Sequence, residues 1–419
     1  METSGGGIHA LSDDALVHSL VRLPSVSVLR CRAVCKDWHR VTTDRSFLVA
    51  HAASRPREMI VQFTRDIYAA VQAMSLEPTQ QQPYRFLCDY DLPGNIENVI
   101  YSLHVQAMSL EPTQQQPYRF LCDYDLPGNI ENVIYSLHGL LVLRQSCDLF
   151  VICNPATRQW TNLPELGPQS HCLPFECGFY FHTSSGEYRL LCHAIEKEEE
   201  EFTNSNFKPE IRRRYYILSA GAILPRRLGP APSDPSGDLP MYEVPVAYRE
   251  NLHWLSRHPQ ANHTKKMLAF DTASETFRLM SQPSPDNTVR TSLFELDGEL
   301  CVAAISQSLT SLDIWGLQDY KAETWTLLHR VHVPMPVLYK RHEVSVSKVI
   351  SLGNGAILIG CPKCDVARMY HLKDKRMICD DFTFGSVVHP RFLVFNESLV
   401  PHAFFDSPRC PDLETIYFS

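Results

Sequence analysis

The first part of the chain, residues 11–51, has the spacing of apolar residues that is typical of short α-helices. Leu16, Leu20 and Leu23 follow one another at positions i, i+4 and i+7, so they share one face of a helix. Pro24 ends this helix, because a proline inside a helix removes a backbone hydrogen bond. The pattern therefore predicts a helical module at this end of the chain.

Capping residues indicate where the helices of this module begin. Ser12 or Asp13 can cap the first helix, and Ser27 can cap a short second one. We expect a third helix to start near Lys36, and Asp44 to open a last turn. A unit of roughly 40 residues buries little surface by itself. It either presents its remaining apolar face to a partner or caps the domain that follows.

Short apolar runs rich in β-branched and aromatic residues replace the helical spacing from about residue 59 onward. Turn residues separate these runs, and this alternation is typical of an all-β region. The clearest runs are residues 59–63, 139–143, 149–153, 215–218, 267–270 and 356–360. We expect each of these runs to form a β-strand.

Several connections between the runs repeat one pattern, a short polar turn followed by an aromatic residue. We interpret four of them as tips of β-hairpins, at residues 154–160, 182–188, 271–277 and 318–325. A strand introduced by Gly or Asn precedes several of them, at Gly139, Asn251, Gly298 and Gly355. The last two complete units, starting near Asn251 and Gly298, are offset by about 47 residues, close to one blade of a kelch-like propeller. We therefore expect a β-propeller without a fixed blade number, with a β-sandwich as the alternative.

Residues 71–104 recur without a single change at residues 105–138. The period of 34 residues equals that of a tetratricopeptide repeat, but each copy contains three prolines and shows no long helical periodicity. Identity at every position indicates a recent tandem duplication or an error in the gene model. Either copy can take the native place, and the surplus residues can be looped out at a modest entropic cost.

Composition and charge narrow the classes of function. The formal net charge of −8 argues against general nucleic-acid binding, which needs a basic surface. The start of the chain lacks the features of a signal peptide, and no run approaches the roughly 18 apolar residues of a membrane span. Fourteen cysteines without a secretory signal indicate reduced thiols, so we expect the protein in the cytoplasm, the nucleus or both.

Few residues qualify as candidates for catalysis or metal binding. Cys361 and Cys364 have the spacing of half a zinc site, but only His371 and Cys379 lie near them. His253 lies between apolar neighbours, and we expect it to be packed or hydrogen-bonded rather than catalytic. The sequence has no phosphate-binding loop, nucleophile elbow or HExxH motif, and nothing singles out a Cys/His pair. We therefore predict no enzymatic activity, no metal and no cofactor.

The helical module resembles the F-box, whose pattern combines Leu-Pro-x-Asp/Glu-Leu, a second Leu-Pro, and a Val-Cys-Lys-x-Trp segment. The matching residues are Leu11, Asp14, Leu20, Leu23, Pro24, Leu29, Arg32, Val34, Cys35, Lys36 and Trp38. One position departs from the pattern, because Ser12 stands where the first proline of the family packs against its partner. This departure weakens the expected docking but leaves the rest of the stripe intact.

The resemblance implies a docking partner. F-boxes bind a Skp-type adaptor, which bridges to a cullin scaffold of a ubiquitin ligase. By this resemblance the adaptor-binding residues are Leu11, Leu16, Leu20, Leu23, Pro24, Leu29, Val34, Cys35 and Trp38. Nothing in the sequence identifies the substrate-binding residues.

The motifs between residues 139 and 385 also resemble the F-box-associated region of the large plant F-box family. The segments that carry this likeness are NPATRQWTNLP, LHWLS, LAFDTASETFRL and LDIWGLQDYKAETWTLLHRV. The expected chain is thus an α+β multidomain protein, in which an F-box precedes a large all-β domain. We place the F-box at 8–53, the all-β domain at 59–395 and a C-terminal tail at 396–419.

The expected function is that of a substrate-recognition adaptor in a Skp-cullin-F-box ubiquitin ligase. Three alternatives remain open at this point. They are a propeller that binds a small molecule or glycan beside a vestigial F-box, a metal-dependent oxidoreductase on a kelch-like propeller, and the product of a decaying gene copy.

Overall fold

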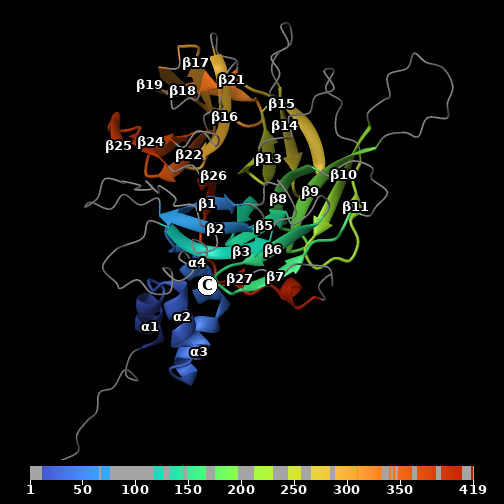
Figure 1. Ribbon diagram of the computed structural model, residues 1–419, viewed down its shortest axis with the longest axis vertical. Coiled ribbons are helices and arrows are strands. Elements are labelled where there is room, and N and C mark those ends of the chain that lie inside the picture. Colours follow the sequence, from blue (N-terminus) through green and yellow to red (C-terminus); the bar gives the residue numbers. More distant parts are fainter. Residues whose placement is uncertain are drawn as a thin grey trace, which may run out of the picture.

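The protein is described here by a computed structural model of the full chain (Figure 1). Its described residues are 12–65, 68–75, 118–125, 133–144, 149–166, 175–196, 212–229, 244–255, 266–283, 288–308, 310–332, 339–340, 343–344, 348–360, 366–383, 388–407 and 417–418. Within them, a small helical module lies against one side of a large assembly of β-sheets.

The helical module contains four short helices, as the apolar spacing predicts. They are α1 (Asp13–Leu20), α2 (Ser25–Cys31), α3 (Lys36–Thr43) and α4 (Arg45–Ala53). Ser12 caps α1 by accepting a hydrogen bond from the backbone N–H of Ala15 at 3.3 Å. The expected cap at Ser27 is wrong, because α2 already begins at Ser25, directly after Pro24. The last element is a full helix rather than a turn, and Asp44 caps it.

Antiparallel sheets form the rest of the described chain. One sheet has five strands: β26 (Val388–Phe395), β1 (Glu58–Arg65), β2 (Tyr68–Ser75), β3 (Tyr118–Asp125) and β27 (Tyr417–Phe418). Five sheets have four strands each: β4 (Val133–Leu137), β5 (Leu140–Arg144), β6 (Phe150–Asn154), β7 (Gln159–Asn162); β8 (Phe175–His182), β9 (Glu187–Glu196), β10 (Arg212–Ser219), β11 (Arg226–Arg227); β12 (Val246–Tyr248), β13 (Asn251–Trp254), β14 (Lys266–Asp271), β15 (Thr276–Ser281); β16 (Thr288–Leu296), β17 (Glu299–Ser306), β18 (Ser311–Asp319), β19 (Thr324–His332); and β22 (Lys348–Gly353), β23 (Ala356–Gly360), β24 (Val366–His371), β25 (Arg376–Thr383). A short hairpin joins β20 (Tyr339–Lys340) to β21 (Glu343–Val344).

The sheets follow one another around a ring, with the first strand of each four-stranded sheet on the inside. Strand β26 contacts β4, β4 contacts β8, β12 contacts β16, β16 contacts β22, and β22 contacts β26 again. Gly178 of β8 lies against Leu252 and Pro245, which brings the sheet of β12 beside that of β8. This arrangement is a β-propeller, as the repeated hairpins predict, and not a sandwich.

The ring closes where the two ends of the propeller pair with each other. Strand β1, which follows the helical module, pairs on one edge with β2 and on the other with β26. Apolar side chains then fill the space between neighbouring sheets, and the indole of Trp254 donates a hydrogen bond to the Cys177 carbonyl at 3.0 Å across one such boundary. The protein is therefore held as a ring by both strand pairing and packing.

The predicted hairpin tips are confirmed, and their turns share one geometry. In three of them a side-chain oxygen of Asn154, Asp271 or Asp319 accepts backbone N–H groups two and three residues later. The last turn residue adopts a left-handed conformation, with positive φ at Arg158, Gly186, Glu275 and Glu323, and Lys375 repeats this conformation in the turn between β24 and β25. The side chain at this turn position can therefore reach sideways toward the neighbouring sheet.

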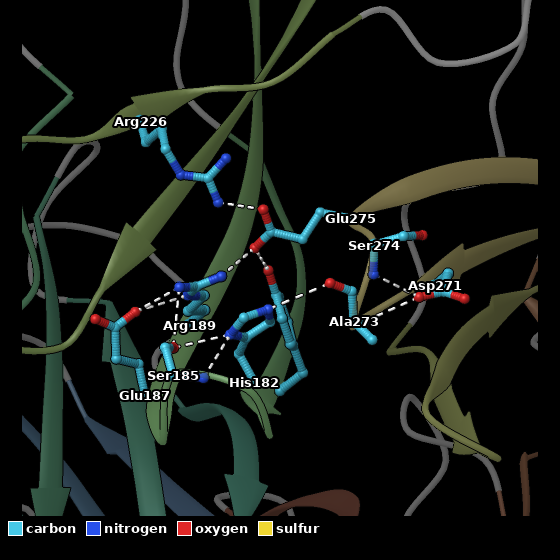
Figure 2. A network of polar contacts seen from close by, with 10 residues as sticks. His182, Ser185, Glu187, Arg189, Arg226, Asp271, Ala273, Ser274 and Glu275 are labelled. Atoms are coloured by element: carbon cyan, nitrogen blue, oxygen red, sulfur yellow. Dashed lines mark hydrogen bonds and ion pairs between the residues drawn. The ribbon is translucent and has the colours of Figure 1, made fainter.

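Glu275 uses this position to tie two sheets together (Figure 2). Its carboxylate accepts hydrogen bonds from Tyr180 at 2.7 Å and from Arg189 at 2.6 Å, and it also pairs with Arg226. Burial by itself raises the pKa of Glu275, but these hydrogen bonds outweigh it and hold the pKa below its ordinary value. Glu323 repeats the arrangement one sheet further on, where it accepts from the backbone N–H of Ser281 at 2.6 Å.

The described strands use parts of both copies of the duplicated segment. Strand β2 ends at Ser75 in the first copy, whereas β3 and β4 come from the second. Gly139, which follows the second copy, has φ +82°, and a Cβ there would lie 2.4 Å from the Cβ of Ser398. The turn after β4 therefore needs a glycine at this position. Val105 follows the first copy and Gly139 follows the second, so only the second copy can supply β4 and its turn. The identical partner of β3, residues 84–91, lies outside the described residues.

Removing residues 76–109 gives the same sequence as removing either copy and keeps β1 to β4 intact. We expect the shortened chain to fold into the same propeller, with a free energy of unfolding unchanged or higher by about 1–2 kcal/mol, because a shorter connection costs less closure entropy. Urea unfolding of both chains measures the difference. A shortened chain that is less stable would show that the surplus residues contribute to the fold.

Replacing Glu275 with Gln is expected to lower the free energy of unfolding by about 2 kcal/mol, because the mostly buried Arg189 loses the more buried of its two charged partners and keeps only Glu187. The matched control is Glu323→Gln, where the ion pair with Arg278 is longer and more exposed, and we expect a loss below about 1 kcal/mol. Urea titrations of the two variants test this order. An equal loss of unfolding free energy in the two variants would show that burial does not strengthen the Glu275 ion pair.

Candidate functional site

The helical module packs around a small apolar core. Its buried members are Leu16, Leu20, Val28, Val41, Phe47 and Leu48, joined by Leu399 from the far end of the chain. Short helices of seven to nine residues supply the first six of these side chains. The module therefore resembles a miniature domain with one shared core.

Two residues of the predicted adaptor-binding stripe belong to this core. Leu16 and Leu20 are only 5% and 3% exposed, so they hold α1 against the other helices. Leu23, Leu29 and Trp38 are half-buried and pack against the core from its edge. Leu16 and Leu20 thus mark the inward face of α1, where they pack inside the module.

The other predicted residues lie nearer the surface. Val34 is 62% exposed, Pro24 is exposed, and Cys35 is partly exposed. Leu11 lies outside the described residues. The structure adds Val26, 55% exposed on α2, which the sequence reasoning missed. Val26 and Leu29 are three residues apart in the same helix, and this spacing could have identified their common face.

Pro24, Val26, Leu29 and Val34 are apolar residues in or beside α2 that are exposed or half-buried, and we call this set the α2 surface. Val26 and Val34 are the large aliphatic side chains of this set that stand most open to solvent. We therefore take the α2 surface as the candidate docking region among the described residues of the helical module.

Polar contacts hold the helices behind the α2 surface in place. Arg40 of α3 pairs with Asp13 of α1 at 2.8 Å. Both side chains are exposed, so this ion pair contributes little to stability. His51 is buried, and its Nε2–H donates to the Leu23 carbonyl at 2.9 Å. Burial lowers the pKa of His51, so the ring is neutral at neutral pH and fixes the end of the α1–α2 connection.

The propeller contains two histidine arrangements that could suggest catalysis. Cys177 Sγ lies 3.2 Å from His193 Nδ1, but both residues are buried in the core between sheets. His253 donates to the Val246 carbonyl and accepts from the Tyr320 hydroxyl at 2.9 Å, as its apolar neighbours led us to expect. Burial lowers the pKa of His253 to about 4. Both arrangements are used in packing: the Cys177–His193 pair is buried between sheets, and both ring nitrogens of His253 are hydrogen-bonded within the protein.

A cavity of about 310 Å³ lies on the axis of the ring. The inner strands line it, with Lys348, Ser292 and His253 among its polar residues and Trp254 and Phe392 among its aromatic ones. Glu275 and its arginines lie in another part of the propeller, and their donors and acceptors are used in holding sheets together. The cavity is the only one of these places with room for a small molecule.

The described residues include no group of three or more His, Cys, Asp or Glu side chains that could hold a metal ion. Cys361 and Cys364 lie outside them, so the half zinc site stays untested. Within the same described residues, no helix has the length and apolar character needed to cross a membrane.

Comparison with solved structures gives only distant likenesses. A chain of a nidogen/laminin complex is 10% identical, with a TM-score of 0.39, and the match covers 81% of this chain and 96% of that chain. An oligogalacturonate lyase in complex with manganese is also 10% identical, with a TM-score of 0.36, over 62% of this chain and 66% of that chain. Scores this low do not establish a shared fold.

Sequence relatives are more informative. An F-box protein of Arabidopsis thaliana is 23% identical over 348 residues, which cover 79% of this chain and 75% of the relative. The F-box domain model matches residues 8–49, which include α1 to α3 and the first part of α4. The F-box associated beta propeller domain model matches residues 102–377, well over half of the chain. The chain therefore belongs to the F-box associated beta propeller family and carries an F-box domain in front of its propeller.

Proposed function

We propose that this protein is the substrate receptor of a Skp-cullin-F-box ubiquitin ligase, bound to its adaptor through the α2 surface. The observation that carries the proposal is the apolar α2 surface, exposed on a module that matches the F-box domain. F-box domains bind Skp-type adaptors, and an F-box joined to a propeller is the general plan of a substrate receptor. The role needs no bond chemistry in this chain, because holding a substrate near a separate enzyme raises its effective concentration.

Strand directions support an assignment of the substrate to the propeller face opposite the F-box. Strand β1 begins at Glu58, just after the helical module, and β26 ends at Phe395 beside it. Because neighbouring strands are antiparallel, the β4–β5 and β6–β7 turns lie on this same side, where Ala156 touches the F-box core. The adaptor and scaffold would crowd this side, so the connections that leave the other face are better placed to bind a substrate. We expect the complex to act in the cytoplasm or nucleus.

The adaptor role is tested by replacing Val26 and Val34 together with Glu. We expect affinity for a purified Skp-type adaptor to fall at least tenfold, because two charges must be buried in an apolar interface. The thermal unfolding temperature should stay within a few degrees, since both side chains are exposed. Isothermal titration calorimetry and thermal unfolding of the same samples provide the two measurements.

Val49→Glu is the matched control, because Val49 is equally exposed but lies on α4. It should leave adaptor affinity unchanged. If only this control loses affinity for the adaptor, the docking surface lies on α4 and not on α2. Leu20→Asp is unsuitable, since it would disrupt the core of the module. If the folded native chain does not bind the adaptor, the ligase role is wrong, and the axial cavity becomes the place to test for small-molecule binding.

A further inference from the structure

The core of the F-box contains a residue from the other end of the chain. Leu399 is 2% exposed and belongs to the same apolar cluster as Leu16, Leu20 and Val28, with Val400 packed at its edge. These contacts join segments more than three hundred residues apart in sequence. The four F-box helices alone therefore leave an opening in their core, and Leu399 fills it.

The segment that carries Leu399 is anchored to the propeller on both sides of that residue. We call this segment, residues 396–407, the strap. Before Leu399, the Asn396 side chain donates at 3.4 Å to the carbonyl of Arg55, which lies between α4 and β1, and the Asn154 side chain of propeller strand β6 donates to the Ser398 carbonyl at 3.0 Å. The second of these bonds is buried. The strap is thus positioned by the propeller before it reaches the F-box.

After Leu399, the strap runs onto the first two four-stranded sheets. Its short helix η2 (Ala403–Asp406) places Phe404 and Phe405 in the apolar cluster between the β4–β7 and β8–β11 sheets. Gly221 lies beneath Phe404, where an added Cβ would come within 3.1 Å. The strap is therefore fixed at both ends, and its middle reaches the F-box core.

We propose that the strap is a structural part of the adaptor-binding module, with Leu399 as its positioning residue, so that the F-box becomes competent for its adaptor only in a chain whose propeller has closed. This inference rests on the proposed function, in which the F-box binds an adaptor. Leu399 packs in the same cluster as Val28, a buried residue of α2. Its removal would loosen the helix that presents Val26 and Leu29.

Ring closure connects this packing to the rest of the fold. Strand β1 follows the F-box directly, β26 precedes the strap directly, and the two strands pair with each other. The strap reaches the F-box core because this pairing brings both ends of the propeller to one place. A chain that lacks β26, or has not yet paired it, cannot bring Leu399 to the F-box, so the adaptor selects completed propellers.

The first test replaces Leu399 with Glu in the full-length chain. Hydrogen–deuterium exchange should show faster exchange in α1 to α4, with propeller strands such as β17 and β18 unchanged, and affinity for a purified Skp-type adaptor should fall at least tenfold. Leu399→Met should restore both properties, because it keeps an apolar side chain of similar volume. Leu327→Glu is the control, since Leu327 is an exposed leucine on the distant strand β19.

The second test displaces the strap without touching the F-box. Gly139→Ala places a Cβ against Ser398, whereas Gly298→Ala adds the same atom in a similar left-handed turn with nothing within 4 Å. Both variants carry the same backbone strain, so the difference between them reports the contact with the strap. We expect only Gly139→Ala to speed exchange in the F-box helices and to weaken adaptor binding.

The outcomes separate this inference from the proposed function. If hydrogen–deuterium exchange in α1 to α4 is unchanged in both Leu399→Glu and Gly139→Ala, the inference is wrong, regardless of the measured affinity for the adaptor. Faster exchange in a chain whose native form never binds the adaptor supports the composite module and overturns the adaptor role. Faster exchange together with lost binding supports both.

Discussion

The pairing of β1 with β26 is the constraint on which the rest of the structure depends. Each four-stranded sheet is built from consecutive strands, so local hairpins are enough to form it. The closing sheet is different, because its strands come from both ends of the propeller. Without this pairing the ring would have two open edges, which a propeller avoids by closing on itself. The same pairing brings the F-box and the strap to one side of the molecule.

Contacts between neighbouring sheets make the closed ring rigid. The left-handed residue at the end of several hairpin turns points a side chain at the adjacent sheet, and Glu275 and Glu323 both use this position for ionic contacts. Buried aromatic residues such as Trp254 and Tyr180 add hydrogen bonds across the same boundary. In the proposed role, such a ring would fix the orientation of a bound substrate relative to the adaptor.

Much of the fold could be predicted from local pattern. The runs at residues 139–143 and 356–360 are strands, the tips at 154–160 and 271–277 are hairpins, and the helix near Lys36 begins there. These features depend on neighbours in sequence: alternation of apolar residues, turn chemistry and capping. The start of α2 was misplaced, because Ser27 has the chemistry of a cap but Pro24 already ends the preceding connection.

The sequence by itself determined that this chain has a helical F-box module, an all-β domain of repeated hairpins, and one segment present twice. Only the tertiary structure decided that Leu20 faces inward while Val26 faces solvent, because burial depends on which elements pack together. It also decided that β4 comes from the second copy, since two identical sequences differ only in what surrounds them, here Gly139 against Ser398. The place of Leu399 in the F-box core has the same origin: contact between distant segments follows from ring closure, which no local pattern encodes.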